Sequence, residues 1–272
     1  MAGKSVQENV TRQNLVEELF DWTVPVEAVP LPSEGKVYSP DSPLHSKSLV
    51  EIKAMTAQEE DILSSPALIR QGTVITQLIK SCIIDKKINV DNMLLGDRNA
   101  IMISIRVTGY GSDYPADITC PACGKKSEQE FNLSDLEINR LDIDPVLPGQ
   151  NLFAYKLPVT GKVVHFKFLT GVDENDRSTL LERTKKITGG SGIEKNITTR
   201  LEYHIVSIEG VEDRNTISQF VSKMPALDSK NLRSYISDNE PGIDMTADIH
   251  CPDCGHEGRV GLPMGATFFW PN

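Results

Sequence analysis

The hydrophobic positions in the first third of the chain recur with a helical period. Between residues 5 and 24 the apolar side chains fall on one side of an amphipathic helix, which breaks at Val24-Pro25. The segment Thr56-Ala57-Gln58-Glu59 has the form of a capping box, in which threonine and glutamate satisfy free N–H groups of the first turn. Helices are therefore predicted over residues 5–24, 57–64 and 72–84, with a shorter one over residues 90–95.

The N-terminal helix is followed by a stretch spaced by prolines, from Val26 to Pro43. Two interpretations remain open for this part of the chain. The helix packs on its own domain, or the prolines carry it away from the core as an arm that docks on a neighbouring subunit.

From Asn99 onward the pattern changes to an alternation of apolar and polar residues. Ile101, Ile103 and Ile105 alternate with Met102, Ser104 and Arg106, which predicts a half-buried strand. Another strand is predicted over residues 116–119, and two more within residues 152–169 around a turn at Thr160-Gly161.

The remaining third mixes both periods. Helices are predicted over residues 173–188, 216–223 and 229–238, the last with Asp228 or Ser229 as its cap, and a helix or strand over residues 197–209. Gly189-Gly190-Ser191-Gly192 is a flexible break. The expected fold class is α+β, with a helical N-terminal part and a large α/β region inserted later in the chain.

Composition excludes several classes of protein. Of the 272 residues, 39% are hydrophobic and 24% charged, as in globular domains, and no apolar run reaches the roughly 18 residues of a membrane span. The net charge of −10 and the absence of a basic cluster beyond Lys125-Lys126 and Lys185-Lys186 disfavour a nucleic-acid partner. Residues 1–14 lack the apolar core of a signal peptide, so a reducing cytosol is expected.

Two cysteine motifs of the same form carry the candidate chemistry. Cys120-Pro121-Ala122-Cys123-Gly124 and Cys251-Pro252-Asp253-Cys254-Gly255 are zinc knuckles, in which two intervening residues let both sulfurs point into one tetrahedral site. Ala116-Asp117-Ile118-Thr119 precedes the first, and Ala247-Asp248-Ile249-His250 precedes the second. Each motif, with the segments before and after it, is therefore expected to form a strand, a knuckle and a second strand. Together the two motifs predict a zinc ribbon split by a long insertion. The predicted ligands of one structural Zn²⁺ are Cys120, Cys123, Cys251 and Cys254.

Two other interpretations of these cysteines are open. The site could pack without binding metal, or one motif could be a redox pair, which would require a strand-to-helix turn. His250 and His256 flank the second knuckle and are expected at the surface, because four thiolates already close the zinc coordination sphere. Cys82 lies on an apolar helical face and is expected to be a buried structural thiol.

Catalytic signatures are lacking in the sequence. No phosphate-binding loop, dinucleotide fingerprint, HExxH or GxSxG motif occurs. Gly96-Asp97-Arg98-Asn99 is read as a polar turn, and His165 and His204 as structural residues. We therefore expect a protein that is not an enzyme and has no small-molecule substrate or membrane partner.

The order of several short segments resembles one known family. The segments are Leu31 to Tyr38, Met55 to Leu63, Leu95 to Ala100, Tyr110 to Tyr114, Asn239 to Asp244 and Phe268 to Pro271. Together with the knuckles they are similar to the baseplate proteins of T4-like contractile-tailed bacteriophages, a family that includes a baseplate hub subunit. The resemblance covers about residues 30–272.

This resemblance implies a late viral protein, made in the host cytoplasm, that takes part in building the virion's tail baseplate. Its partners would be other baseplate and tail proteins, with self-association left open. The expected organisation is an N-terminal helix and arm over residues 1–43, a region leading to the first knuckle over 44–123, an inserted α/β region over 124–250, and the second knuckle with a C-terminal strand over 251–272.

Two competing functions are kept. A zinc-ribbon protein of the transcription type would bind nucleic acid, which the net charge of −10 opposes. A metalloenzyme would need a coordination position left open for water, which four thiolates do not provide.

Overall fold

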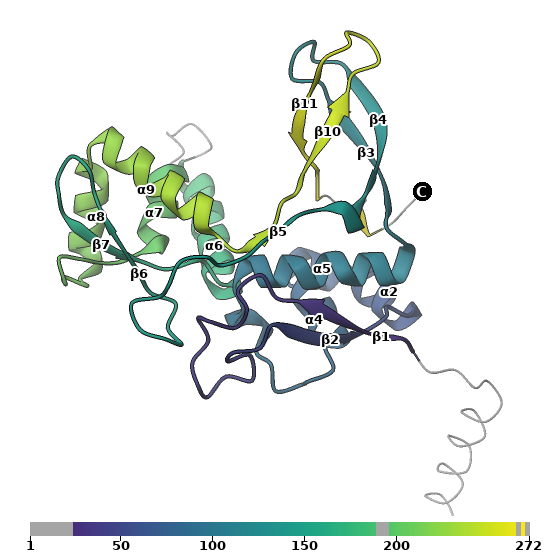
Figure 1. Ribbon diagram of the computed structural model, residues 1–272, viewed down its shortest axis with the longest axis horizontal. Coiled ribbons are helices and arrows are strands. Elements are labelled where there is room, and N and C mark those ends of the chain that lie inside the picture. Colours follow the sequence, from purple (N-terminus) through teal and green to yellow (C-terminus); the bar gives the residue numbers. More distant parts are fainter. Residues whose placement is uncertain (1–23, 189–195, 265–267, 270–272) are drawn as a thin grey trace, which may run out of the picture.

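The computed structural model describes residues 24–188, 196–264 and 268–269, arranged in three groups of elements (Figure 1). We call residues 26–110 the base, residues 153–239 the lobe, and residues 113–132 with 246–261 the paired hairpins. The lobe lies beside the base, and the paired hairpins project from the base.

The base packs helices on a two-stranded antiparallel sheet. Its elements are β1 (Val26–Pro30), β2 (Leu49–Lys53), α2 (Ala57–Ser64), α3 (Pro66–Gln71), α4 (Val74–Cys82), the 3-10 helix η1 (Val90–Asn92) and α5 (Leu95–Tyr110). The helix predicted over residues 57–64 is confirmed with its capping box, since the Glu59 carboxylate accepts the Thr56 N–H at 3.0 Å. The prediction over residues 72–84 is confirmed as α4, and only a 3-10 turn forms within residues 90–95.

The strand predicted over Ile101 to Ile105 is wrong, because this segment is the middle of α5. Residues two apart on a helix point to nearly opposite sides, yet Ile101, Ile103 and Ile105 are all buried. They are buried because α5 is covered on several sides, by the helices and sheet of the base and by the chain entering the paired hairpins. A helix that is surrounded loses the one-sided pattern that identifies a surface helix.

The turn predicted at Gly96 to Asn99 is also wrong, since these residues form the first turns of α5. Asp97 is fully buried there. Its carboxylate accepts the Ser33 N–H at 2.9 Å, the Ser33 hydroxyl at 2.6 Å and the Tyr38 hydroxyl at 2.5 Å. Burial raises the pKa of Asp97 against the opposing effect of these donors. The loop from Leu31 to Tyr38 is thereby fixed to the start of α5.

The lobe contains a three-stranded antiparallel sheet in the order β6-β7-β8. Its elements are β6 (Phe153–Lys156), β7 (Val163–Phe166), α6 (Gly171–Thr188), α7 (Asn196–His204), β8 (Ile205–Ile208), α8 (Arg214–Lys223) and α9 (Ala226–Asn239). The two strands around Thr160-Gly161 and the predicted helices are confirmed. Residues 197–209 contain both of the expected alternatives, a helix and then a strand.

Asp228 does not cap α9 as predicted, because the helix begins two residues earlier, after Pro225. Its buried carboxylate instead accepts the N–H groups of Val159 at 2.7 Å and Thr160 at 3.0 Å. Asp228 therefore fastens the β6-β7 turn to α9.

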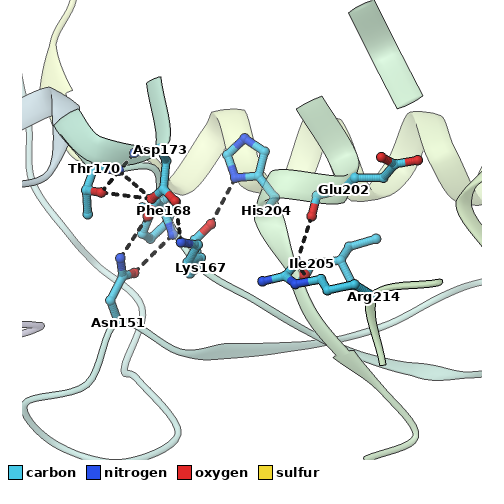
Figure 2. Close-up of polar contacts among 9 residues, drawn as sticks. All are labelled: Asn151, Lys167, Phe168, Thr170, Asp173, Glu202, His204, Ile205 and Arg214. Carbon is cyan, nitrogen blue, oxygen red and sulfur yellow. Dashed lines mark hydrogen bonds and ion pairs between the residues drawn. The ribbon is translucent and has the colours of Figure 1, made fainter. Parts of the chain in front are cut away.

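Figure 2 shows how polar contacts fix the junctions of the lobe. Asn151 donates to the Phe168 carbonyl at 2.7 Å and accepts the Phe168 N–H at 3.0 Å. The buried His204 ring lies at the end of α7, with Nδ1 2.9 Å from the Lys167 carbonyl. This bond requires Nδ1 to carry the proton. Burial lowers the pKa of His204 to about 4, so the ring is neutral.

The base and the lobe share an order of elements that the sequence pattern did not reveal. In each, a pair of antiparallel strands is followed by the pattern Lys-x-x-Thr-x-x-acid, which leads into a helix. In the base the pattern consists of Lys53, Thr56 and Glu59, at the start of α2. In the lobe it consists of Lys167, Thr170 and Asp173, at the start of α6. In each, the lysine ammonium contacts the acid, at 2.7 Å for Lys53–Glu59 and 2.6 Å for Lys167–Asp173.

The correspondence continues after these helices. The chain returns through α4 or α7 to the second hairpin strand, where Ile83 bridges Ile52 and Ile205 pairs with Phe166. A long helix then leads to a cysteine-bearing hairpin, from α5 in one case and from α9 in the other. The described chain therefore consists of two halves of similar construction.

A short antiparallel pair joins these halves beneath the paired hairpins. β5 (Ile138–Asn139) leaves toward the lobe and β9 (Gly242–Ile243) returns from it. Gly96 of α5 lies so close to this pair that a Cβ atom there would approach the Pro241 carbonyl oxygen to 1.7 Å. Only glycine permits this contact.

Some predictions lie outside the described residues. These are the N-terminal helix up to residue 23, the glycine-rich break at 189–192, and most of the closing segment. Of that segment, Phe268 and Phe269 are described and buried.

We predict that Gly96→Ala destabilises the protein by about 2–3 kcal/mol, because backbone atoms of Pro241 and Gly242 occupy the space of the new methyl group. Gly109→Ala on the same helix is the matched control. Its methyl would meet the Met55 side chain, at 2.9 Å from Cε and 3.2 Å from Cβ, and no backbone of another segment, so the free energy of unfolding should change by less than about 1 kcal/mol. Urea unfolding of both variants measures the difference, and equal stabilities would contradict the close approach.

A second prediction concerns pH. The folded pKa of His204 is about 4 and its unfolded pKa is about 6.5. Between pH 6.5 and pH 4, His204 binds a proton in the unfolded chain but stays neutral in the folded protein. The free energy of unfolding therefore falls by up to about 3 kcal/mol as the pH falls through this range. In His204→Asn, whose amide can replace Nδ1–H and does not titrate, this loss should disappear. His165→Gln should retain this loss of stability. Unfolding curves of the wild-type protein and the two variants between pH 4 and 7 test the prediction.

Candidate metal centre

The two cysteine motifs form the tips of two antiparallel hairpins. The first hairpin is β3 (Asp113–Thr119) with β4 (Lys126–Asn132), and the second is β10 (Thr246–His250) with β11 (Glu257–Gly261). The predicted strand over residues 116–119 is confirmed within β3. Figure 1 shows the two hairpins side by side, with both tips at the same end.

The backbone folds identically at the two tips. The N–H of Cys120 donates to the Lys125 carbonyl, and that of Cys251 donates to the His256 carbonyl, both at 2.9 Å. The N–H of Gly124 and that of Gly255 donate to the carbonyl of the first cysteine of their motif, again at 2.9 Å. Both glycines have positive φ, +74° and +69°, as the tight turn requires.

These turns bring all four predicted ligands together. The sulfurs of Cys120, Cys123, Cys251 and Cys254 lie within 4.8 Å of one another. Across the hairpins, Cys120 Sγ lies 3.8 Å from Cys254 Sγ, and Cys123 Sγ lies 3.7 Å from Cys251 Sγ. A zinc ion bound by four thiolates at about 2.3 Å sets its sulfurs about 3.8 Å apart. The donor set and its spacing therefore fit a tetrahedral zinc site.

The sheet faces behind the tips hold the hairpins in this register. Along β3, Tyr114, Ala116 and Ile118 are buried while their neighbours are exposed, and Ile249 of β10 is buried with them. The alternation shows that the hairpins pack face to face through their apolar sides. At the tips, Lys125 Nζ lies 2.6 Å from an Asp253 carboxylate oxygen.

The electrostatics of the four thiols favour a bound cation. The Cys123 backbone N–H stabilises the Cys120 thiolate and lowers the pKa of Cys120 to about 7. At Cys254 the His256 N–H acts in the same direction, but the neighbouring sulfurs prevail and raise the pKa to about 12. Four thiolates at this spacing repel one another, and a divalent ion removes that repulsion.

The side chains of the two flanking histidines are not among the ligand side chains of the cluster. His250 is exposed and lies 3.4 Å from the Glu257 carboxylate. His256 lies over Gly258. Within the described ranges, the four cysteines form the one group of three or more potential ligand side chains that could hold a metal ion.

The placement of the motifs opposes the redox interpretation. Both lie on hairpin turns, so neither has the helix N-terminus that lowers the pKa of the attacking thiol in redox motifs. Cys82, as expected, is buried in α4, and burial raises its pKa to about 12.

Arg106 is a structural residue that the sequence pattern missed, because it was read as the polar side of a strand. Its buried guanidinium donates to the carbonyls of Phe268 at 2.7 Å, Gly111 at 2.6 Å and Asp113 at 3.0 Å. The Phe268 ring meets Tyr114 edge to face, with centroids 5.4 Å apart. Arg106 thus ties the start of β3 and the C-terminal segment to the end of α5.

Comparison with known proteins gives one clear match. The family described as T4 bacteriophage base plate protein matches residues 29–270. Searches of the curated proteins and of the solved structures returned no match.

The four-sulfur geometry predicts one metal per chain, and Zn²⁺ is the expected ion. Mass spectrometry of the intact native protein should find one zinc, absent from Cys251→Ser. Because the site links residues over a hundred positions apart, its loss should destabilise the protein by about 4 kcal/mol. Cys82→Ser, which changes a buried thiol outside the site, should keep its zinc. Two zinc ions per chain would show that the knuckles bind separately, and a folded wild-type protein without metal would exclude the site.

Proposed function

The chain belongs to the T4 bacteriophage base plate protein family, and from this premise we propose that it is a hub-type component of the contractile tail, stabilised by one structural zinc. Membership implies a structural role in the baseplate, a place in the virion tail and contact with other tail proteins. The hub position, the zinc and an assembly stage in the host cytoplasm are the finer parts of the proposal.

The observation that carries the zinc proposal is the convergence of four sulfurs from two distant hairpins. Four thiolates would complete the coordination sphere and leave no position for water, as in structural rather than catalytic zinc sites. The site would then serve to fasten the hairpins to one another. Their exposed tips would present a rigid surface to a neighbouring subunit.

The arrangement suits a building block that must keep its shape. The β5-β9 pair, the close contact at Gly96 and the Arg106 bonds already fix the lower ends of the paired hairpins. A zinc at the tips would fix the other end. The four segments 1–43, 44–123, 124–250 and 251–272 are retained as the proposed organisation.

The surface of the first hairpin disfavours the nucleic-acid alternative. Its outward side chains include the exposed acids Asp117, Glu128 and Glu130, which repel phosphate. Lys125, which favoured that alternative, is paired with Asp253. Among the described residues, no helix is long and apolar enough to cross a bilayer.

The proposal is tested in the phage that encodes the chain. An antibody against the protein should label purified tails at the baseplate, close to the tail axis for a hub component. Phage carrying Cys251→Ser should form few complete tails, while Cys82→Ser phage should assemble normally.

The outcomes separate the parts of the proposal. Labelling of assembly intermediates but not of mature tails would assign the chain to assembly alone. Peripheral labelling would remove the hub position. Normal tails from Cys251→Ser phage would show that the zinc site is dispensable, and absence of the protein from both tails and intermediates would refute the baseplate role.

A further inference from the structure

The lobe contains a pocket whose lining is unusually basic for an acidic protein. The pocket has a volume of about 380 Å³ and lies among α6, α7 and α9. Arg177, Arg200 and Arg233 line it, one from each helix, together with apolar side chains of Ile197, Leu201 and Ile236. Three arginine side chains therefore border a partly apolar space.

The other half of the chain shows how the same helix interface is built without a pocket. Arg177 follows Thr170 by the same number of positions as Leu63 follows Thr56. Leu63 is buried in the contact between α2 and α4. At this position an arginine in the lobe replaces a core leucine in the base.

The second and third arginines replace apolar residues in the same way. When Ile205 is matched to Ile83, Arg200 corresponds to Leu78. Leu78 is fully buried.

When the helices are counted back from the first cysteine of each knuckle, Arg233 corresponds to Met102, which is also buried. By contrast, Leu201 corresponds to Ile79, and Ile236 to Ile105, and all four are buried. The side chains at the bottom of the helix interface are therefore apolar in both halves. Those at its edge are apolar in the base and are replaced by arginines in the lobe.

The charges around the pocket leave one positive charge without a counterpart. Arg177 pairs with Glu174 at 2.6 Å, and Arg200 lies 3.6 Å from the Glu240 carboxylate. The Arg233 guanidinium has no hydrogen bond or ion pair with any described residue. The uncompensated charge is that of one guanidinium.

We propose that this pocket binds a carboxylate side chain, with a neighbouring aliphatic residue, from an acidic segment of another protein of the tail. A single negative charge matches the single unpaired arginine, and a guanidinium binds a carboxylate through two parallel hydrogen bonds. The exposed Ile197 offers apolar surface to the aliphatic neighbour, and the buried Leu201 and Ile236 lie behind it in the pocket lining. A phosphate dianion matches neither feature.

The pocket chemistry stands on these residues alone, whereas the identity of the partner as a tail protein rests on the proposed function. The experiment therefore uses a defined probe and no tail. The probe is the blocked pentapeptide acetyl-Gly-Leu-Glu-Leu-Gly-amide, added to the full-length, isotope-labelled protein and followed by NMR. Its glutamine analogue, inorganic phosphate and a single-stranded oligonucleotide are the comparison ligands.

The glutamate peptide is expected to shift backbone amides of α7 and of the second half of α9. Arg233→Met installs the residue found at the corresponding position of the base, and should weaken peptide binding about tenfold, as expected for one charge-assisted hydrogen-bonded pair. Lys230→Met removes an exposed charge one turn away on α9, outside the pocket, and should change affinity less than about twofold. Because Arg233 is exposed, both variants should unfold at the wild-type temperature.

Four results would overturn the proposal. Equal binding of the glutamine peptide would show that charge is not recognised. Tighter binding of phosphate or of the oligonucleotide at the same amides would assign the pocket to phosphate groups. Absence of shifts in α7 and α9 at millimolar peptide, or unchanged affinity in Arg233→Met, would show that the arginines are only surface charges.

Discussion

The buried carboxylate of Asp97 is the interaction on which the arrangement of the chain depends. A charge without access to water must be satisfied by donors, and here Ser33 and Tyr38 supply them from a loop about sixty positions earlier. Tyr38 also accepts the Leu94 N–H at 3.0 Å, so the loop is bound to the helix start at two points. One residue before Asp97, Gly96 admits the returning chain at Pro241. Three of the segments whose order resembles the baseplate family, Leu31 to Tyr38, Leu95 to Ala100 and Asn239 to Asp244, therefore meet at the start of α5, while Phe268 is held at its other end by Arg106.

Local signals in the sequence identified the elements whose chemistry is local. The capping box at Thr56 and Glu59, the turn at Thr160-Gly161 and the knuckle glycines depend on neighbours a few residues away, and each forms as expected. The four cysteines also come together as predicted, because two motifs of the same form indicate one shared site. The surrounded helix α5 was misread, since its isoleucines find apolar neighbours on several sides and no polar face remains to show a helical period. Asp97, Asp228 and Arg106 were misjudged for a related reason. The partners of Asp97 and Asp228, and Phe268 among the partners of Arg106, lie far away in sequence, and no local pattern distinguishes a buried charge with distant partners from a solvated one.

The two halves of the chain use one plan for different purposes. In the base, the interface among α2, α4 and α5 is closed by leucine, methionine and cysteine side chains and serves as core. In the lobe, arginines and a neutral histidine stand at the corresponding positions, while the apolar floor is kept. The polar rim lowers the burial of apolar surface at this interface. The lobe also contains an aromatic cluster, in which Tyr235 of α9 stacks on Tyr155 with ring centroids 4.5 Å apart. Similar construction thus leaves one half to support the fold and the other free to present charged groups.

The separation of the two knuckles along the chain also sets an order of events during synthesis. Cys251 follows Cys123 by 128 positions. At a translation rate of about 5–20 residues per second, the first pair of cysteines waits roughly 6–26 s for the second pair to leave the ribosome. During that interval the nascent chain offers two thiols and an unpaired apolar hairpin face, open to oxidation or to an incorrect partner. Synthesis of the lobe, which lies between the two knuckles, therefore precedes closure of the four-sulfur site in every newly made molecule.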